Sequence, residues 1–463
     1  MRLSSSNIKL IIMSRVSTKG APMELGNEKI SRLLVQYAIP AIIAQTAASL
    51  YHMIDSIFIG QGVGPLAISG LATTFPFMNL SAAFGAMIGV GGATQLSVKL
   101  GQRDYESACT ILGNLVTLNV IVGGLFGIIS LLFLDNILFF FGASEATLPY
   151  ARDFMEVLLY GNIITHLYFG INAALRASGH PKESMYATFI TVACNLVLAP
   201  LFIYVFDWGI RGAALATMLS QVITLMWQLK LLSNPNELLH LHKGIYALKA
   251  RFVKGIVSIG LSPFLINAAA CVVVIIINKG LRQYGDNGDM AIASYGIANR
   301  VIFVFIMVIL GVCQGMQPIV GYNFGARNHE RVKETLKQTI GWALIVTFTG
   351  FALCEGIPEL ISRAFTTDAT LVANASKGMR ISSIFIMLAG VQMVATNFFQ
   401  SINKVNKAIF LSLTRQVLFL IPLLLILPRF MGEDGVWYSI PIADLISGIL
   451  AVIMLRGQFK ARQ

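Results

Sequence analysis

The sequence is built from a series of apolar runs, each long enough to cross a lipid bilayer. A membrane-spanning helix needs about 20 predominantly apolar residues. Twelve runs of this kind alternate with polar, charged loops along the 463 residues. Only 12% of the residues are charged, and the mean hydropathy is +0.73. These features predict an all-α polytopic membrane protein, because a membrane β-barrel would show short segments of alternating hydropathy instead.

The predicted spans differ in length, and several are longer than a bilayer requires, which permits tilt or extension beyond the hydrocarbon. Their approximate limits are 33–60, 67–98, 107–134, 148–178, 183–206, 210–232, 254–281, 290–322, 335–358, 371–401, 405–428 and 435–455.

The basic residues predict how the chain is oriented. With an even number of spans, both termini lie on one side, and most of the 34 Lys and Arg residues fall in or beside segments on that side. The positive-inside rule therefore predicts cytoplasmic termini. The net charge of +12 is explained by this topology. It does not indicate nucleic-acid binding, because the basic residues are spread over loops and are not clustered with aromatic residues.

The two halves of the chain repeat each other. The stretch GQRDYESACTILGNLV from Gly101 resembles GARNHERVKETLKQTI from Gly325. The same offset along the chain relates the stretches around Arg176 and Gln400. Six spans per half is an even number, so both halves have the same orientation. We therefore expect two six-helix lobes related by a pseudo-two-fold axis along the membrane normal, with a cavity between them near the midplane.

This repeat divides the chain into four parts. Residues 1–22 are basic and Ser-rich and lack the features of a signal peptide, so we expect a disordered N-terminal extension. The N-lobe covers residues 23–232 and the C-lobe covers residues 254–463. Between them, residues 233–253 form the longest loop on the side of the termini, and this segment is the predicted cytoplasmic linker.

One acidic residue in the first span has no acidic counterpart in the repeat. Asp55 lies five residues before Gly60, about 8 Å from the outer end of its span. A charged side chain inside hydrocarbon is costly and marks a functional site by default; the alternative is a helix-end acid in contact with interfacial water. When the two halves are aligned through Pro40 and Pro263, Asp55 falls on Asn278. We therefore expect proton or cation coupling in the N-lobe.

The sequence shows no enzyme signature. Its six His residues form no HExxH or Ser/His arrangement, and the five Cys residues have no CxxC spacing. No Gly-rich nucleotide loop is present. We therefore predict a protein that is not an enzyme, needs no cofactor and does not use ATP.

Several motifs resemble the multidrug and toxic compound extrusion (MATE) transporters, in their bacterial branch. They are the Asp late in the first span, NLVLAPLFIY in the fifth, GMQPIVGYNFGARNHERVKETLK after the eighth and GVWYSIPIADLIS in the last. The resemblance covers nearly the whole chain from about Met23. It implies a secondary active exporter in the bacterial inner membrane that moves cationic or amphipathic drugs out against protons or sodium.

The resemblance also implies a cation-coupling site in the N-lobe. Asp55 matches the acidic residue of the first span, Asn195 an Asn of the fifth, and Thr217 a Thr of the sixth. The resemblance also makes Asp55 a candidate sodium ligand. The family often has a second Asp where this chain has Ala199. That difference, with His52 one helical turn before Asp55, favours protons over sodium, and the choice stays open.

Other polar residues in the spans are weaker candidates for proton or substrate contact, since polar side chains in membrane helices more often hydrogen-bond between helices. They are Gln45, Tyr51, His52, Asn172, Gln314, Gln317, Gln392, Asn397 and Asp444. For Asp444 the alternative role is an ion pair with Arg415.

Two alternative functions remain open. A lipid-linked oligosaccharide flippase would share the two-lobe plan but would need a large cationic groove, whereas Arg415 is the clearest intramembrane cation here. A membrane-embedded enzyme is a weaker alternative. The predicted partners are small drugs and membrane lipid, without nucleic acid, and the predicted state is a monomer.

Overall fold

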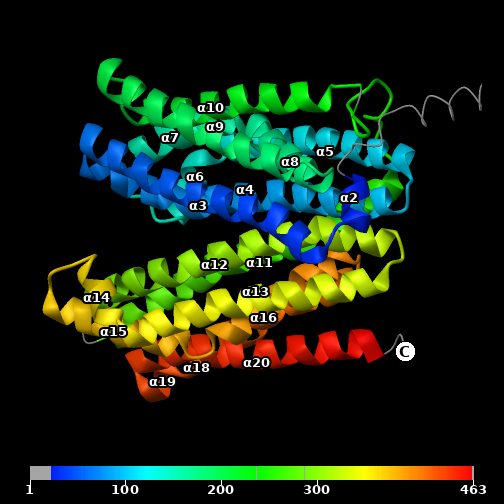
Figure 1. Cartoon of the computed structure of the whole chain (residues 1–463). Coiled ribbons are helices and arrows are strands. Elements are labelled where there is room, and N and C mark those ends of the chain that lie inside the picture. The colour runs from blue at the N-terminus through cyan, green and yellow to red at the C-terminus, as the bar shows by residue number, and fades with distance from the viewer. Residues whose placement is uncertain (1–21, 236, 286, 461–463) are drawn as a thin grey trace, which may run out of the picture.

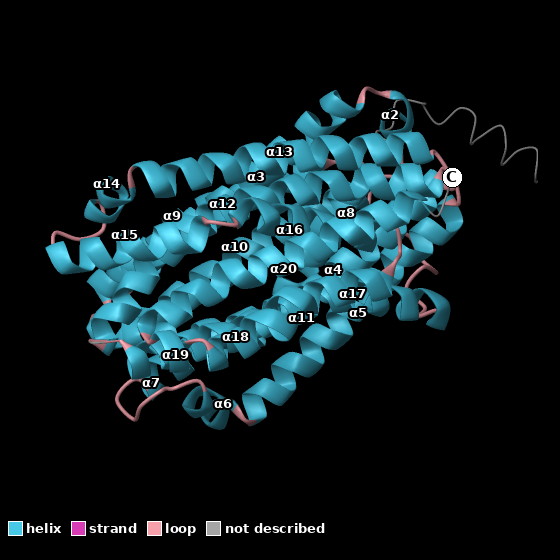
Figure 2. Ribbon diagram, turned by 90° about the horizontal axis from the view of Figure 1, so that it is seen from below, coloured by secondary structure: helices cyan, strands magenta, loops and turns pink. Residues whose placement is uncertain are grey.

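The computed structural model describes residues 22–235, 237–285 and 287–460. Every regular element in these ranges is a helix, and none of the described residues forms a strand (Figure 2). Within these described ranges, ten helices are long and apolar enough to cross a membrane, and two bent helix pairs bring the total to as many as 12. The all-α polytopic fold is confirmed, and its helices overlap all twelve predicted spans, although several helix ends differ by a few residues.

The N-lobe holds the first six spans, which the text below names by the following labels. They are α3 (Ile30–Gly62), α4 (Pro65–Gly101), α5 (Tyr105–Leu132), the pair α7 (Leu148–Tyr160) and α8 (Asn162–Ala177), α9 (Pro181–Pro200) with the π-helix η1 (Leu201–Val205), and α10 (Gly209–Leu232).

The C-lobe repeats this order. Its spans are α11 (Ala250–Tyr284), α12 (Gly288–Gly325), α13 (His329–Gly356), the pair α15 (Ala369–Ser383) and α16 (Ile386–Ser401), α17 (Val405–Leu413) with the π-helix η2 (Thr414–Leu420) and α18 (Ile421–Ile426), and α20 (Glu433–Lys460). Four short helices complete the described chain: α2 (Pro22–Asn27), α6 (Leu134–Phe140), α14 (Pro358–Arg363) and α19 (Pro428–Met431).

The predicted ends of the N-terminal extension and of the linker differ slightly from the structure. The predicted N-terminal extension, residues 1–22, lies outside the described residues except for Pro22, which begins α2. The linker is shorter than predicted at its far end, because α11 begins at Ala250. The predicted span begins only at residue 254 because Arg251 and Lys254 make the first turn of α11 resemble a loop in a hydropathy profile.

The repeat is visible in unusual backbone conformations. Arg103 and Arg327 both have a positive φ, 59° and 60°, although neither is glycine. Gly179 and Asn403 form a second positive-φ pair at the same spacing along the chain. Side chains other than glycine adopt this conformation rarely. Its recurrence at matched positions shows that the two halves share one backbone plan.

The bent spans match as well. Span four bends by 59° between α7 and α8, and span ten bends by 53° between α15 and α16. The first break lies at Gly161, and the second includes Phe385, the equivalent position of the repeat. Glycine is a common cause of a helix break. The second break contains neither Gly nor Pro, so local sequence does not account for it.

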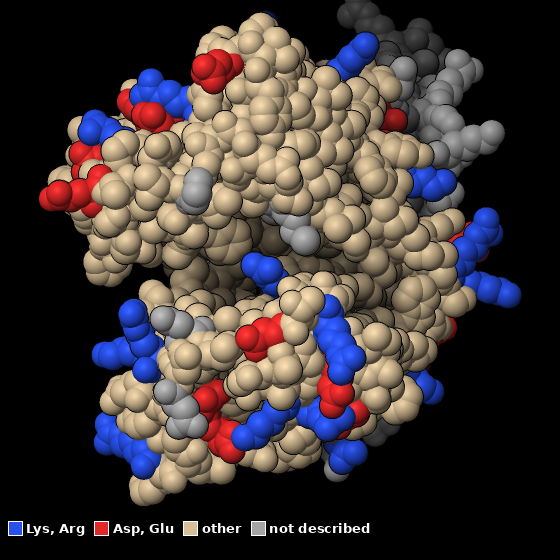
Figure 3. Space-filling view, turned by 90° about the vertical axis from the view of Figure 1, so that its left-hand side faces the viewer, with Lys and Arg blue, Asp and Glu red and all other residues tan. Residues whose placement is uncertain are grey.

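The two lobes lie side by side with their long helices running between the same two ends of the molecule (Figure 1). The C-terminus and α2 lie at one end, which we call the terminal end (Figure 1). At the opposite end the surface is hollowed between the lobes (Figure 3). The molecule therefore has a cleft between the lobes that opens at the end opposite the termini.

Glycine residues allow the lobes to meet closely at the terminal end. A Cβ atom on Gly101, the last residue of α4, would collide with the carbonyl oxygen of Tyr322. A Cβ on Gly325, the last residue of α12, would collide with the carbonyl oxygen of Val98. These contacts are reciprocal and involve equivalent positions of the repeat, as expected for a pseudo-two-fold axis between α4 and α12.

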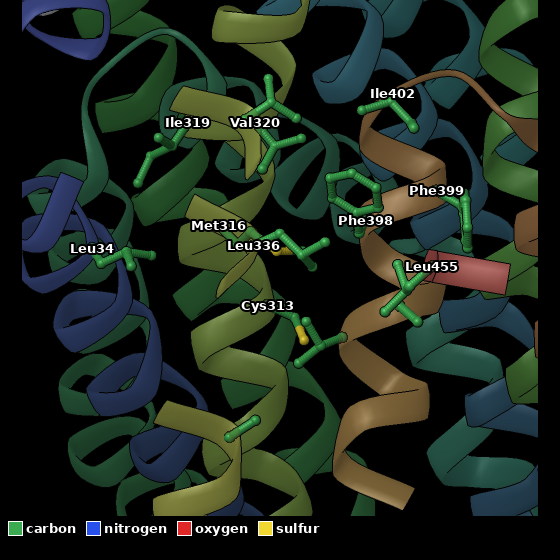
Figure 4. Close-up of a cluster of buried hydrophobic side chains, with 14 of the residues drawn as sticks. Leu34, Cys313, Met316, Ile319, Val320, Leu336, Phe398, Phe399, Ile402 and Leu455 are labelled. Atoms are coloured by element: carbon green, nitrogen blue, oxygen red, sulfur yellow. The ribbon is translucent and has the colours of Figure 1, made fainter. Parts of the chain in front are cut away.

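The first helix of each lobe crosses to the other lobe. Residues Ile30, Leu33 and Leu34 of α3 are buried in a hydrophobic cluster built mainly from C-lobe helices (Figure 4). Ile256 of α11 is buried in a cluster built mainly from N-lobe helices. Farther along, Ile59 of α3 is buried among N-lobe residues. Each of these helices therefore starts in one lobe and ends in the other.

Candidate functional site

The acidic side chain of Asp55 is buried in the outer half of α3. It is 7% exposed. Its Oδ1 atom is buried and has no hydrogen-bond partner among the described residues. A buried ionised carboxylate is stable only when a proton, a cation or hydrogen bonds compensate its charge. Asp55 therefore has a buried acceptor available for a proton or a cation.

Three polar side chains meet one helical turn from Asp55. The Tyr51 hydroxyl lies 2.8 Å from the Thr217 Oγ1. The Asn195 Nδ2 donates to the Tyr51 hydroxyl at 3.3 Å and to the Thr217 Oγ1 at 3.1 Å. Because residues four apart lie on the same helix face, this Tyr51–Asn195–Thr217 triangle and Asp55 line the same side of α3. We call the four residues the N-lobe polar site.

The two residues predicted to lie near Asp55, Asn195 and Thr217, therefore contact each other, and both contact the Tyr51 hydroxyl. Asn195 is 1% exposed, so its amide is shielded from solvent. It lies on α9, and Thr217 lies on α10, which packs against α9. The Asn195 donor contacts Tyr51 and Thr217, not Asp55.

The donor set of this site includes a single carboxylate. Ala199, where the family often has an Asp, is fully buried among N-lobe apolar residues. Within the described ranges no group of three or more His, Cys, Asp or Glu residues could hold a metal ion. Hydroxyl and amide oxygens can add to one carboxylate in binding sodium, but the same set also suits a proton on Asp55.

His52 belongs to α3 by its backbone, but its side chain lies outside the described residues. Gln45, two turns nearer the terminal end, is half-buried. A role of His52 in proton or substrate contact therefore stays a prediction.

Most of the weaker candidates hydrogen-bond within their own lobe. Asn172 accepts from Ser184. Gln317 donates to Asn397 at 2.8 Å. Gln392 donates to the carbonyl oxygen of Leu411 at 2.8 Å. Gln314 is half-buried in α12. These contacts hold helices together, and no described contact brings these residues to Asp55.

Asp444 has the ion-pair partner that the sequence suggested. The Arg415 Nε donates to the Asp444 Oδ1 at 2.5 Å. The Asp444 side chain is 3% exposed and that of Arg415 is 19% exposed. The pair joins η2 to α20 inside the C-lobe. Substrate contact at Asp444 remains a prediction, but its charge is already balanced by Arg415.

A further polar cluster was missed by sequence reasoning. In the N-lobe the Ser81 hydroxyl donates to Asn162 Oδ1 at 2.8 Å and lies 3.3 Å from the His166 Nε2. His166 is 1% exposed. Each residue is a single polar group in an apolar run, so nothing in the sequence indicates that α4 and α8 bring them together.

Comparisons with known proteins agree with this architecture. The model of the MatE family matches residues 40–201 and 263–426, once in each lobe. The chain is 27% identical over 430 residues to the "Multidrug export protein MepA" of Staphylococcus haemolyticus (strain JCSC1435), covering 92% of this chain and 93% of that protein. It is 25% identical over 424 residues to the protein of the same name from Staphylococcus aureus (strain NCTC 8325 / PS 47), covering 92% and 93%.

Solved structures show the same fold. One is described as the "Outward-facing conformation of a multidrug resistance MATE family transporter of the MOP superfamily", with a TM-score of 0.89, 24% identity and coverage of 96% of this chain and 99% of that chain. Another, "Crystal structure of MATE in the bent conformation", has a TM-score of 0.90 at 24% identity, covering 96% and 98%. The relatives are named as export proteins and transporters, not enzymes. The two-lobed chain with its buried N-lobe acid belongs to the MatE family.

Proposed function

We propose that the protein is a secondary active multidrug exporter of the bacterial cytoplasmic membrane. It exchanges cationic or amphipathic drugs for protons or sodium by alternating access. The observation that carries this proposal is the buried Asp55, whose Oδ1 lacks a hydrogen-bond partner among the described residues. The relatives named multidrug export proteins support the substrate class.

The orientation follows from the basic residues on the side of the termini. If the termini are cytoplasmic, as the basic residues predict, the closed terminal end faces the cytoplasm and the cleft that Figure 3 shows at the opposite end faces outward. A drug released from this cleft leaves the cell. The coupling cation enters through the same cleft and reaches Asp55 in the outer half of α3.

The mechanism rests on competition for one carboxylate. A proton or sodium ion on Asp55 neutralises its charge, so the site no longer attracts a cationic drug. An ionised Asp55 has to be compensated by water or by a cationic ligand. Because both ligands shift the same equilibrium between lobe arrangements, binding of one lowers the affinity for the other. The triangle beside Asp55 orients that response by tying α3 to α9 and α10.

We favour protons as the coupling ion. Ala199 supplies no second carboxylate at the position where the family often has one, and sodium is bound better by several oxygen ligands of which some are charged. A proton needs only one carboxylate oxygen, such as Asp55 Oδ1.

The flippase alternative is weakened by the C-lobe ion pair. Arg415 was its clearest intramembrane cation, and its Nε is bound to Asp444. We further propose that the protein acts as a monomer, without nucleic acid as a partner.

The test is drug export by purified protein in lipid vesicles, with proton and sodium gradients imposed separately. The native protein should drive uphill export with a proton gradient alone. Asp55→Asn should fold and insert into vesicles normally but fail to export uphill, whereas Asp153→Asn, which removes a surface acid, should export as the native protein does. Equal uphill export by Asp55→Asn would refute the assignment, and export driven by sodium alone would change the coupling ion.

A further inference from the structure

Two segments at the terminal end each lie just before the first helix of one lobe but bind to the other lobe. The first is α2, which precedes α3. The second is the end of the linker, residues 245–249, which precedes α11. Both are held by side chains that bind backbone groups, and we call the two contacts the α2 anchor and the linker anchor.

The α2 anchor is formed by two C-lobe side chains. The Arg331 Nη2 donates to the carbonyl oxygens of Leu25 at 3.1 Å and Glu28 at 2.6 Å. The Asn323 Nδ2 donates to the Leu25 carbonyl at 3.0 Å. The Arg331 Nε donates to Asn323 Oδ1 at 3.0 Å, which holds both side chains in place. Asn323 is fully buried, so its bond to Leu25 is shielded from solvent, whereas Arg331 is half-buried.

The linker anchor is formed by two side chains of the N-lobe helix α5. The Asn114 Nδ2 donates to the Ala247 carbonyl at 3.0 Å, and its Oδ1 accepts from the Lys249 backbone N–H at 2.8 Å. The Thr117 Oγ1 donates to the Tyr246 carbonyl at 2.9 Å. Asn114 is fully buried. The linker is thus fastened to the N-lobe up to the residue before α11.

Close packing supports the linker anchor. A Cβ on Gly113 would collide with the carbonyl oxygen of Ile245, so the linker backbone lies directly on α5. Ile245 itself is 5% exposed within the N-lobe core. Similarly, Leu25 of α2 is 1% exposed and belongs to the cluster of the C-lobe. Each anchor therefore combines hydrogen bonds with a buried apolar side chain.

The two anchors fix the starts of α3 and α11, which are the helices that cross between the lobes. The inner part of α3 lies against α12, where a Cβ on Gly315 would come 2.6 Å from the Ala38 Cα. The inner part of α11 lies against α4, where a Cβ on Gly91 would collide with the Ile256 carbonyl. These contacts close the terminal end, so holding the two helix starts in place holds that end shut.

We propose that Arg331 and Asn114 are positioning residues that keep the terminal end of the transporter closed while the cleft is open. This inference rests on the proposed alternating access. Opening the terminal end requires α3 and α11 to move relative to the lobe that each anchor grips. The anchors oppose that motion and set how often the terminal end opens.

The C-lobe offers a matched control for Asn114. Gln338 occupies the equivalent position of α13, and its Nε2 donates only within its own helix, to Glu334 at 3.0 Å. Lys333, an exposed cation close to Arg331 on α13, is the control for loss of charge. Neither control makes a described contact with α2 or the linker.

The experiment measures access to the closed end. Ser97 is 2% exposed. A Cβ on Gly321 of α12 would come 2.9 Å from the Ser97 Cβ. In a chain whose five native cysteines are replaced, Ser97→Cys reports opening by its rate of maleimide labelling from the cytoplasmic side of inverted vesicles. We expect Arg331→Met and Asn114→Leu to raise this rate roughly tenfold, the effect of losing a buried hydrogen-bonded contact.

Gln338→Leu and Lys333→Met should leave the labelling rate within about twofold of the background chain, as surface substitutions usually do. Should either anchor variant fail to fold, Thr117→Val removes one hydrogen bond to the linker, along with a bond within α5, and should raise the rate about threefold. Unchanged labelling in the anchor variants, or an equal rise in the controls, overturns the proposal. Labelling does not depend on a drug gradient, so a failure of the proposed export function would leave this readout intact.

Discussion

The N-lobe and the C-lobe use corresponding helices to hold different polar groups. At Asp55 the N-lobe has an acid with an unpartnered buried oxygen among the described residues, whereas Asn278 occupies the matching C-lobe position. The C-lobe has the Arg415–Asp444 ion pair. In the repeat these two residues correspond to Thr191 and Ser220, both neutral. The N-lobe therefore has a buried carboxylate with one oxygen available to a ligand, and the C-lobe has a charge-balanced ion pair that joins two helices.

This difference explains why duplication of one fold need not duplicate one activity. A balanced ion pair resists change, because removing either charge leaves the other buried and uncompensated. A single buried acid is neutralised when a proton binds to it, and its charge is compensated when a cation binds beside it. Under the proposed ion coupling, the N-lobe acid responds to the ion while the C-lobe pair keeps its charges balanced.

The strongest challenge to this comparison is to move the acid. The double variant Asp55→Asn/Asn278→Asp keeps the number of charges but places the acid in the C-lobe. Uphill export should fall roughly 5- to 150-fold, the span of typical coupling energies between two sites, because the Tyr51–Asn195–Thr217 triangle stays behind. Transport in vesicles would measure this, and recovery of native export would show that the lobes are equivalent.

The second test concerns the ion pair. Asp444→Asn should lower the free energy of unfolding by about 3 kcal/mol, since it leaves the half-buried Arg415 charge uncompensated inside the C-lobe. The double variant Arg415→Met/Asp444→Leu should lie much closer to the native value. Denaturant unfolding in detergent gives both values. In the N-lobe, Thr191→Val removes the 2.8 Å contact to Thr224 and should cost only about 0.6 kcal/mol.

The third test concerns the junction of the triangle. Tyr51→Phe keeps the ring but removes the hydroxyl that contacts Asn195 and Thr217. We expect a loss of about 1 kcal/mol in unfolding free energy, measured in the same way. Tyr204→Phe is the control: its hydroxyl bonds the Phe58 carbonyl at 3.2 Å, but the residue is 48% exposed, so its loss should be smaller. Equal losses of unfolding free energy in the two variants would mean that the triangle stabilises the protein no more than an exposed hydrogen bond does.

The smallest effect is expected at two matched helix caps. Asp104 caps α5 by accepting from the Ser107 N–H, and Asn328 caps α13 by accepting from the Arg331 N–H. Burial opposes ionisation of Asp104, but the hydrogen bonds from Lys99 and Ser107 prevail and lower its pKa. Its contribution is therefore present above the ordinary Asp pKa, about 3.9, and is lost as the pH falls through the lower pKa of the folded state.

Replacing this acid by the amide of the other lobe isolates that contribution. Asp104→Asn should change stability by less than about 0.5 kcal/mol at neutral pH, because Asn caps as well as Asp and exposed ion pairs contribute little. Thermal unfolding measured from neutral pH down through the ordinary Asp pKa should show a weaker acid dependence than in the native protein. If the unfolding temperature of Asp104→Asn falls with acidic pH as steeply as that of the native protein, carboxylates other than Asp104 cause the acid sensitivity.

The fold was largely predictable because hydropathy alone defines membrane spans. Twelve apolar runs, a constant offset and the basic loops contain the two-lobed plan before any contact is known. Helix ends were less predictable: the first turns of α11 are basic, so its start at Ala250 is hidden in the linker. The bend at Phe385 contains no Gly or Pro, so the sequence did not predict it.

The site was predictable only in part. Asp55 is visible because an acid in an apolar run is costly. Asn195 and Thr217 were suggested by family resemblance, and their meeting at Tyr51 depends on how α3, α9 and α10 pack. The Ser81–Asn162–His166 cluster was not predictable, since single polar residues in separate spans give no sign of their neighbours.

The crossing of α3 and α11 has a consequence for how the protein is made. The N-lobe leaves the ribosome first, when the C-lobe helices that bury Ile30, Leu33 and Leu34 do not yet exist. Its own core is also incomplete until Ile256 arrives. Neither lobe can reach its final packing alone. The newly synthesised N-lobe therefore stays in the membrane with an incompletely packed interface until the C-lobe helices are inserted. Quality control of this protein is therefore expected to act on the half-made chain.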